Sequence, residues 1–257
     1  MNTQRMPTLF IGHGSPMNAI EDNVITRGWR EVAARLPKPR AILCVSAHWE
    51  SRGVFACAVE RPQTIHDFYG FPQALFDVQY PAPGDPALAQ RIGEVVKGVQ
   101  VHTTTEWGLD HGAWSVLRVM YPAADIPTLQ LSIDTSQPGA FHYALGHELG
   151  ALRDEGVLLI GSGNIVHNLR LLDFRSPTPP AWVTRIDSTV RSAIVDGRHD
   201  SLIDWRNLDR EITLAVPTPE HYLPLLYVLG AQREDDRIEL FNAEYFSTIS
   251  MTSARVG

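Results

Sequence analysis

The chain has 257 residues, of which 44% are hydrophobic and 20% are charged, so it can form a core and is not a disordered chain. Its two cysteines exclude a disulfide-stapled scaffold and a zinc module built on several thiolates. The net charge of −7 argues against a nucleic-acid binder that depends on phosphate neutralisation. The 10 histidines still permit a metal site made of imidazoles.

Short apolar runs alternate with amphipathic segments along the chain. The apolar runs predict buried strands at 8–11, 41–45, 54–59, 128–133 and 157–160. The amphipathic segments predict helices at 27–36, 85–96, 139–153, 182–195 and 220–229. The stretch 238–251 is expected to be extended, as an edge hairpin. This order predicts one α/β domain over 1–257, with a central mixed sheet flanked by helices.

No apolar run approaches the roughly 20 residues that a membrane helix needs. The N-terminal segment 1–7 lacks the apolar core of a signal peptide. We therefore expect a soluble, cytoplasmic protein that binds neither membranes nor nucleic acid.

Three histidines each follow a predicted strand. His13 comes after the first strand, His48 after the second, and His167 a few residues after the fifth. In open α/β sheets, ligands bind beyond the carboxyl ends of the strands, so one edge of the sheet would receive all three imidazoles. Any one of them alone is better interpreted as a loop residue. Their agreement is what favours a shared metal site at the strand carboxyl ends.

Two further histidines are candidates for the same site. His111 lies in a turn before the apolar run 113–121, and His221 lies at the start of a predicted helix. The positive end of a helix dipole favours neutral imidazole, which is the form that binds a metal. Four other histidines are interpreted as surface or structural residues: His102, His142, His147 and His199.

The segment 66–72 gathers aromatic side chains beside His66, with Phe68 and Tyr69 next to it. It fits a surface turn folded onto the core, and it equally fits a wall that stacks on a flat substrate ring. The glycines at 12–14 and 161–163 match neither a phosphate-binding loop nor a nucleophile elbow. We interpret them as tight turns that let backbone approach a site closely.

Five short motifs in this order resemble one known family. They are FIGHGSP at 10–16, SAHWE at 46–50, HDFYGFP at 66–72, LDHGAW at 109–114 and GSGNIVHNL at 161–169. Each motif is short, but five in order are specific. Together they resemble the class III extradiol ring-cleavage dioxygenases, in particular the 4,5-DOPA dioxygenase (DODA-type) branch. The resemblance runs from about residue 7 to the C-terminal strands.

The resemblance implies a non-haem metal site and a role for each of the five histidines. His13 and His48 match the two histidines that bind the metal, and His221 matches the one that completes the site. His167 matches an acid/base in ferrous enzymes, which becomes a ligand where zinc is bound. His111 matches a histidine that faces substrate or oxygen.

One position departs from the wider class, which uses two histidines and a carboxylate. The third position reads Glu220-His221, so either residue is a candidate ligand, and the resemblance points to His221. Fe(II) would serve dioxygenase chemistry, and Zn(II) also suits an all-imidazole set.

The expected partners are a catechol, either DOPA or a related compound, and O2. The expected product is a ring-opened semialdehyde. A zinc-dependent hydrolase using the same histidines and a non-catalytic binding protein are the alternatives. The identity of the catechol, the bond cleaved and formation of a homo-oligomer stay open.

Overall fold

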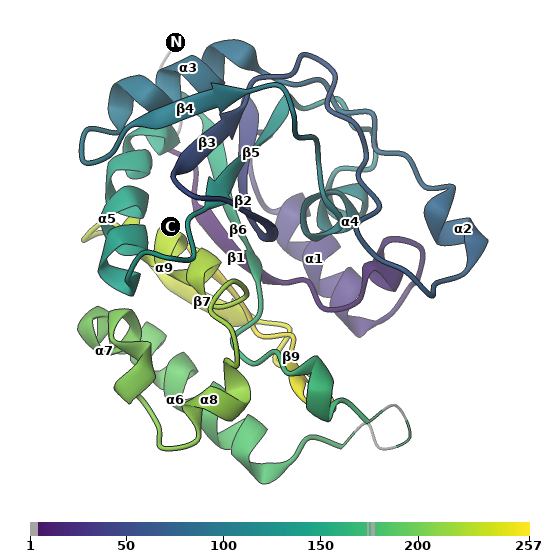
Figure 1. Ribbon diagram of the computed structural model, residues 1–257, viewed down its shortest axis with the longest axis vertical. Coiled ribbons are helices and arrows are strands. Elements are labelled where there is room, and N and C mark those ends of the chain that lie inside the picture. Colours follow the sequence, from purple (N-terminus) through teal and green to yellow (C-terminus); the bar gives the residue numbers. More distant parts are fainter. Residues whose placement is uncertain (1–4, 174, 176–177) are drawn as a thin grey trace.

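The computed structural model describes residues 5–173, 175 and 178–257 (Figure 1). Within these residues the strands are β1 (Thr8–Gly12), β2 (Ala41–Glu50), β3 (Val54–Cys57), β4 (Val101–Thr104), β5 (Thr128–Ile133), β6 (Val157–Gly163), β7 (Ile238–Phe241), β8 (Tyr245–Phe246), β9 (Ile249–Ser250) and β10 (Ser253–Val256). Eight of these described strands form one sheet in the order β4-β3-β5-β2-β6-β1-β10-β7, and β8 and β9 form a separate hairpin.

The centre of the sheet is parallel and its flanks are mixed. Strands β5, β2, β6 and β1 run parallel to one another, whereas β10 pairs antiparallel with both β1 and β7, and β3 pairs antiparallel with β5. The mixed sheet and all five predicted strands are confirmed. The prediction missed β4, because this edge strand is half exposed and lacks an apolar run.

Helices cover both faces of this sheet (Figure 1). They are α1 (Val24–Ala34), α2 (Gln73–Phe76), α3 (Pro86–Val95), α4 (His111–Met120), α5 (Gly139–Leu149), α6 (Ala181–Val195), α7 (His199–Ile203), α8 (Ile212–Ala215) and α9 (Leu223–Gly230). Short 3-10 turns are η1 (Pro16–Ala19), η2 (Gly150–Glu155), η3 (Leu169–Leu171) and η4 (Trp205–Asn207). Helices α1 and α4 pack on one face, and α3, α5 and α9 pack on the other.

Successive residues of the central strands enter different cores. In β2, Leu43 packs with α5 and α9, whereas its neighbour Ile42 packs with α1 and α4. In β6, Leu159 and Leu158 divide in the same way. Side chains of a strand alternate between faces, so a strand covered on both sides has to be apolar at every position. This explains why continuous apolar runs predicted these strands.

The predicted helices are present, with shifted ends. The Asp85 side chain accepts a hydrogen bond from the Leu88 N–H (2.9 Å), and Pro86 is the first residue of α3. The helix predicted at 220–229 begins only at Leu223, because a turn closed by the Tyr222 N–H and the Pro219 carbonyl precedes it. The stretch 238–251 holds β7, β8 and β9, but β7 pairs with β10, beyond the predicted segment.

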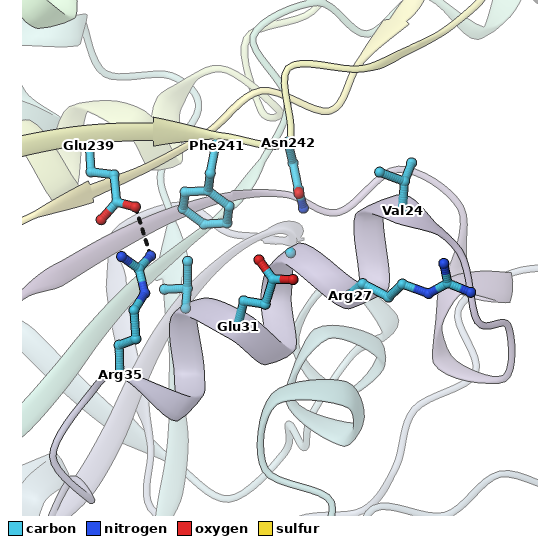
Figure 2. Close-up of a pocket in the computed structure, with 9 residues that line it drawn as sticks. Val24, Arg27, Glu31, Arg35, Glu239, Phe241 and Asn242 are labelled. Atoms are coloured by element: carbon cyan, nitrogen blue, oxygen red, sulfur yellow. Dashed lines mark hydrogen bonds and ion pairs between the residues drawn. The ribbon is translucent and has the colours of Figure 1, made fainter.

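A groove of about 320 Å³ lies between α1 and the edge strand β7 (Figure 2). Its charged side chains have partners nearby, such as Arg35 with Glu239 at 2.7 Å and Arg27 with Asp22 at 2.7 Å. Asn242 donates to the Ile25 carbonyl (2.8 Å) and ties the strand to the helix. The groove is lined by none of the histidines predicted to form a site.

Across the described ranges, none of the helices is both long and apolar enough to cross a bilayer.

Candidate active site

Three adjacent parallel strands bring histidines to the same edge of the sheet. His13 directly follows Gly12 at the end of β1, His48 lies near the end of β2, and His167 lies four residues after Gly163 of β6. Because β2, β6 and β1 are neighbours and parallel, their carboxyl ends coincide.

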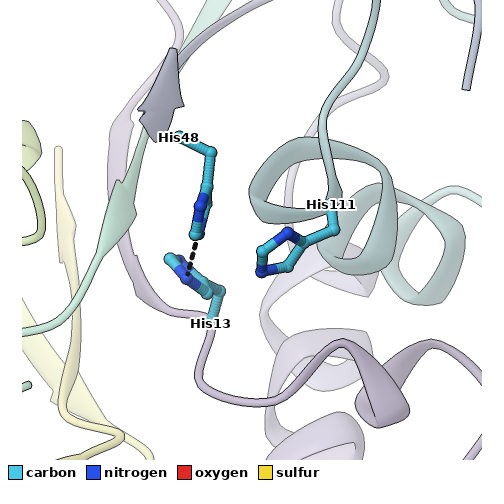
Figure 3. Close-up of side chains that lie close together, drawn as sticks. All are labelled: His13, His48 and His111. Atoms are coloured by element: carbon cyan, nitrogen blue, oxygen red, sulfur yellow. Dashed lines mark hydrogen bonds between the residues drawn. The ribbon is translucent and has the colours of Figure 1, made fainter. Parts of the chain in front are cut away.

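The cluster contains five imidazoles: His13, His48, His111, His167 and His221. Ring centroids lie 5.0 Å apart for His13 and His48, 3.9 Å for His48 and His111, and 3.5 Å for His167 and His221. Figure 3 shows three of them, with His13 from the segment after β1, His48 from β2 and His111 from the start of α4.

An irregularity in β2 accompanies His48. The pairing with β5 shifts register between Val45 and Glu50, so more residues of β2 than of β5 lie in this interval. A bulge of this kind bends a strand and changes the direction of a side chain. His48 was predicted to follow the strand, but β2 continues through it to Glu50.

Gly112 allows α4 to approach β2 closely. A Cβ atom at Gly112 would lie 2.4 Å from Ser46 Oγ and 2.9 Å from His48 Cδ2, so no larger residue fits without movement. The helix begins at His111 and is capped by Asp110, whose side chain accepts from the Ala113 N–H (3.2 Å). This close contact places the His111 ring against His48.

Two glycines of β6 let the backbone around His221 approach the sheet closely. A Cβ at Gly163 would lie 2.1 Å from the His221 carbonyl oxygen, and one at Gly161 would lie 2.4 Å from the Pro224 carbonyl oxygen. The Asn164 N–H also donates to the His221 carbonyl (2.8 Å). The close approach expected here is present, but both glycines lie within a strand and not in a turn.

Hydrogen bonds fix the tautomer of His13. The Ser162 hydroxyl donates its single hydrogen to the Gly112 carbonyl (2.6 Å), so it can only accept at 3.0 Å from His13 Nδ1. His13 therefore carries its proton on Nδ1 and keeps a lone pair on Nε2.

Carboxylates act in the same way on two other rings. His111 Nδ1 lies 2.9 Å from Asp67 Oδ2, and His221 Nδ1 lies 3.0 Å from Glu220 Oε1. An ionised carboxylate only accepts hydrogen bonds, so both Nδ1 atoms carry hydrogen and both Nε2 atoms keep lone pairs. His48 Nδ1 is 3.5 Å from Asp67 Oδ2, which is an electrostatic contact and too long for a good hydrogen bond.

The arrangement of Nε2 atoms fits a metal ion. His13 Nε2 and His48 Nε2 are 3.1 Å apart (Figure 3), a separation that two ligands of one metal ion can have. His221 Nε2 is buried and has no hydrogen-bond partner within the described part of the chain. Buried nitrogens with free lone pairs are the donors that zinc and ferrous iron bind, and Nδ1 hydrogen bonds are typical of metal-ligating histidines.

The possible ligand atoms fall into two groups. Those of His13, His48 and His111 lie within 4.8 Å of one another, and so do those of His167, Glu220 and His221. Of the two candidates in the Glu220-His221 pair, the carboxylate already accepts from His221 Nδ1 and from Thr218 Oγ1 (2.8 Å). The imidazole keeps an unused lone pair on Nε2, so its chemistry suits a metal ligand better than that of Glu220.

Burial keeps these imidazoles neutral. It lowers the pKa of His13, His48 and His221 well below the ordinary histidine value, and the neighbouring histidines lower it further. Burial likewise lowers the pKa of His167 to about 4. Neutral imidazole is the form that coordinates metal, so the cluster is ready to bind at neutral pH.

The aromatic segment 66–72 lies partly against the cluster. The Phe68 ring contacts His111 edge-on, with centroids 5.6 Å apart. His66 Nε2 is 3.0 Å from the Val78 carbonyl oxygen, and its ring packs beside Phe68. Tyr69 is 92% exposed. Of the three residues predicted to contact substrate, Phe68 is therefore the one already placed beside a histidine of the cluster.

The four remaining histidines lie outside the cluster. His142 is buried, with Nδ1 3.0 Å from the Tyr227 hydroxyl, and His199 Nδ1 is 2.8 Å from the Tyr143 hydroxyl. His102 and His147 are exposed. Asp67 and Ser162 were not predicted to belong to the site, although both lie inside motifs that resemble the family. Each lies far along the sequence from the imidazole it contacts, so the sequence carried no signal that connects them.

The chain matches a family model described as the catalytic LigB subunit of aromatic ring-opening dioxygenase over residues 7–257. It is 50% identical over 264 residues to the 4,5-DOPA dioxygenase extradiol of Escherichia coli (strain K12), covering 100% of this chain and 97% of that protein. It is 40% identical over 248 residues to the 4,5-DOPA dioxygenase extradiol of Beta vulgaris, covering 91% and 90%.

A solved structure agrees with these matches. The crystal structure of an uncharacterized protein from Escherichia coli K12 superimposes with a TM-score of 0.86 at 44% sequence identity. The match covers 98% of this chain and 100% of that one. The chain therefore belongs to the family of the catalytic LigB subunit of aromatic ring-opening dioxygenase, and it is a ring-cleavage dioxygenase.

Proposed function

We propose that this protein is a metal-dependent extradiol dioxygenase that opens the ring of a catechol, DOPA or a related compound, with O2 to a semialdehyde. The observation that carries the proposal is the cluster of imidazoles at one edge of the sheet. The Nδ1 atoms of His13, His111 and His221 have hydrogen-bond partners, His13 Nε2 and His48 Nε2 face each other, and His221 Nε2 has no partner among the described residues. The names of the relatives, 4,5-DOPA dioxygenase extradiol, support the substrate class.

His13, His48 and His221 would hold the metal. When bound, Fe(II) supplies both a Lewis acid for the catechol oxygens and the redox chemistry that zinc lacks. The imidazoles need no deprotonation at neutral pH, because burial lowers the pKa of all three. Zn(II) would fit the same nitrogens without supporting ring cleavage.

His167 and His111 are the proposed acid/base residues. His167 stacks on His221 with an interplanar angle of 10°, and its neutral ring can accept a catechol proton above about pH 4. His111 lies on the other side of the cluster, where its Nε2 lone pair faces inward and its Nδ1 is held by Asp67. The Asp67 carboxylate would pair with the imidazolium if His111 takes up a proton.

The 66–72 segment is the proposed substrate wall. Phe68 already packs edge-on against His111 and would present a flat surface to an aromatic ring. His66 supports Phe68 from behind. Tyr69 would contact substrate only after turning inward, because its side chain now faces solvent.

Anaerobic loading with Fe(II), followed by oxygen-electrode assays on DOPA and other catechols, tests the proposal. We expect oxygen uptake with at least one catechol and a yellow semialdehyde product, and neither with Zn(II)-loaded protein. Absence of turnover with every catechol tested would contradict it.

The all-imidazole donor set also suits a zinc-dependent hydrolase, which is the second candidate. Its signature would be zinc-dependent hydrolysis that continues when oxygen is removed. The cytoplasmic location and a homo-oligomeric state stay predictions.

A further inference from the structure

Asp67 contacts two residues of the histidine cluster through one carboxylate. Its Oδ1 accepts from the backbone N–H of His111 (2.9 Å), and its Oδ2 lies 2.9 Å from His111 Nδ1. The same Oδ2 is 3.5 Å from His48 Nδ1. Because His111 is the first residue of α4, its N–H has no acceptor inside the helix. One side chain therefore binds both the backbone and the ring of the same histidine.

Backbone contacts hold Asp67 in this place. The Ile65 N–H donates to the Leu109 carbonyl (2.7 Å), and the Leu109 N–H donates to the Gln63 carbonyl (2.8 Å). The Trp114 indole N–H donates to the Ile65 carbonyl (2.8 Å). The segment that carries Asp67 is thus fastened to both sides of His111, on the chain before it and on α4 after it.

We propose that Asp67 is a positioning residue for ring opening, because its carboxylate holds His111 in the Nδ1–H tautomer with the Nε2 lone pair facing the cluster. The proposal rests on the proposed function for the role of His111 in the reaction. An acceptor is required at this point, since a donor facing Nδ1 would force the hydrogen onto Nε2.

The ionised carboxylate suits this role better than a neutral group. Hydrogen bonds to a charged acceptor are stronger than neutral ones, and the positive end of α4 adds a favourable interaction. Burial alone would raise the pKa of Asp67, but the hydrogen bonds from the ring and the backbone N–H of His111 hold it below its usual range. The group is therefore an acceptor at neutral pH.

Asp67→Asn is the informative change. Asparagine can still accept from the His111 backbone N–H through its oxygen, but then its NH2 faces Nδ1. The ring has to move its hydrogen to Nε2 or lose the contact. Asp77→Asn is the matched control, because Asp77 is an exposed carboxylate at the end of α2 whose partner is Gln73.

The first readout needs neither metal nor substrate. Long-range proton–nitrogen spectra of metal-free protein labelled with 15N-histidine distinguish the two tautomers, and a His111→Gln spectrum identifies the signal. We expect Nδ1–H in the wild type and in Asp77→Asn, and Nε2–H in Asp67→Asn.

The second readout is turnover of the Fe(II)-loaded protein. We expect kcat to fall on the order of 10⁴-fold in Asp67→Asn, the size seen when a carboxylate that orients a catalytic histidine becomes an amide. KM should change little, because the Asp67 carboxylate is bound to His111 and the aromatic surface of the proposed wall comes from Phe68. Asp67→Glu, which keeps an acceptor, should recover part of the loss.

Two results would overturn the proposal: an Nε2–H tautomer of His111 in the wild type, or an Asp67→Asn protein that matches Asp77→Asn in both readouts. If Asp67→Asn does not fold, the tautomer of His111 in the wild type and the turnover of Asp67→Glu still test the proposal. If no catechol is turned over but the tautomer changes as expected, the proposed function fails while the effect of Asp67 on His111 stands.

Discussion

The two flanks of the histidine cluster hold their imidazoles in different ways. On the strand flank, His13 and His48 come from the ends of β1 and β2, and the partner of His13 is the neutral, fully buried Ser162. On the loop flank, His111 and His221 come from segments outside the sheet, and their partners are Asp67 and Glu220.

The two flanks therefore contribute different things: the strand flank fixes the position of the rings, and the loop flank supplies the negative charge. The strand flank is fixed by backbone pairing, and its neutral partner adds no charge to a buried region. The loop flank supplies the carboxylates, whose side chains remain partly exposed at 22% for Asp67 and 16% for Glu220. A buried ion that is unpaired is costly, so charge is kept where water still reaches it.

The largest expected effect is on the strand flank. His13→Ala removes one inward nitrogen from a rigid position, so we expect stoichiometric metal binding and ring opening to be lost together. Metal analysis and oxygen uptake measure this, with His147→Ala on the exposed side of α5 as the control. Full metal content in His13→Ala would show that His13 is not a metal ligand.

Lowering the pH tests how burial lowers the pKa of the clustered histidines, an effect found on both flanks. The pKa of His167 is lowered from 6.5 to about 4, so between these values the unfolded chain binds a proton that the folded chain does not. The free energy of unfolding of metal-free protein should therefore fall by about 2 kcal/mol from pH 7 to pH 5 for this residue alone. Urea titrations measure it, and an equal fall in His167→Gln would contradict the assignment.

Removing each acceptor compares the flanks directly. Glu220→Ala should weaken metal binding by about 100-fold and Ser162→Ala by about 10-fold, because a charged acceptor binds the Nδ1–H more strongly than a hydroxyl. Competition with a chromophoric chelator gives both affinities. Equal losses of metal affinity in the two variants would mean that the acceptor only orients the ring and that the charge of the acceptor has no effect.

The smallest expected effect lies at the substrate wall beside the loop flank. Phe68→Ala should raise KM for a catechol by about 5-fold through loss of the aromatic contact, with kcat less affected. Tyr69→Ala should change KM less, because the ring is exposed. Steady-state kinetics on both variants decide this. A larger effect for Tyr69 would show that its ring closes over the substrate.

The sequence by itself determined the sheet and the strands that deliver histidines. Runs such as 41–45 and 157–160 are apolar at every position because both faces of the sheet are covered, and this pattern is local. His13, His48 and His167 could be assigned to one edge because parallel strands share a carboxyl end. The motifs then indicated the family, which the comparisons confirm.

Only the tertiary structure decided how the rings are held. Asp67 is 44 residues from His111, and Ser162 is 149 residues from His13, so no local pattern connects them. Glu220 and His221 are adjacent in the sequence, but their roles as hydrogen-bond acceptor and donor depend on which atom faces inward. Tautomers and close backbone contacts, such as Gly163 against His221, depend on distances across the fold. Hydrophobic patterning sets which residues are buried, but hydrogen-bond direction is set by contacts that folding alone brings together.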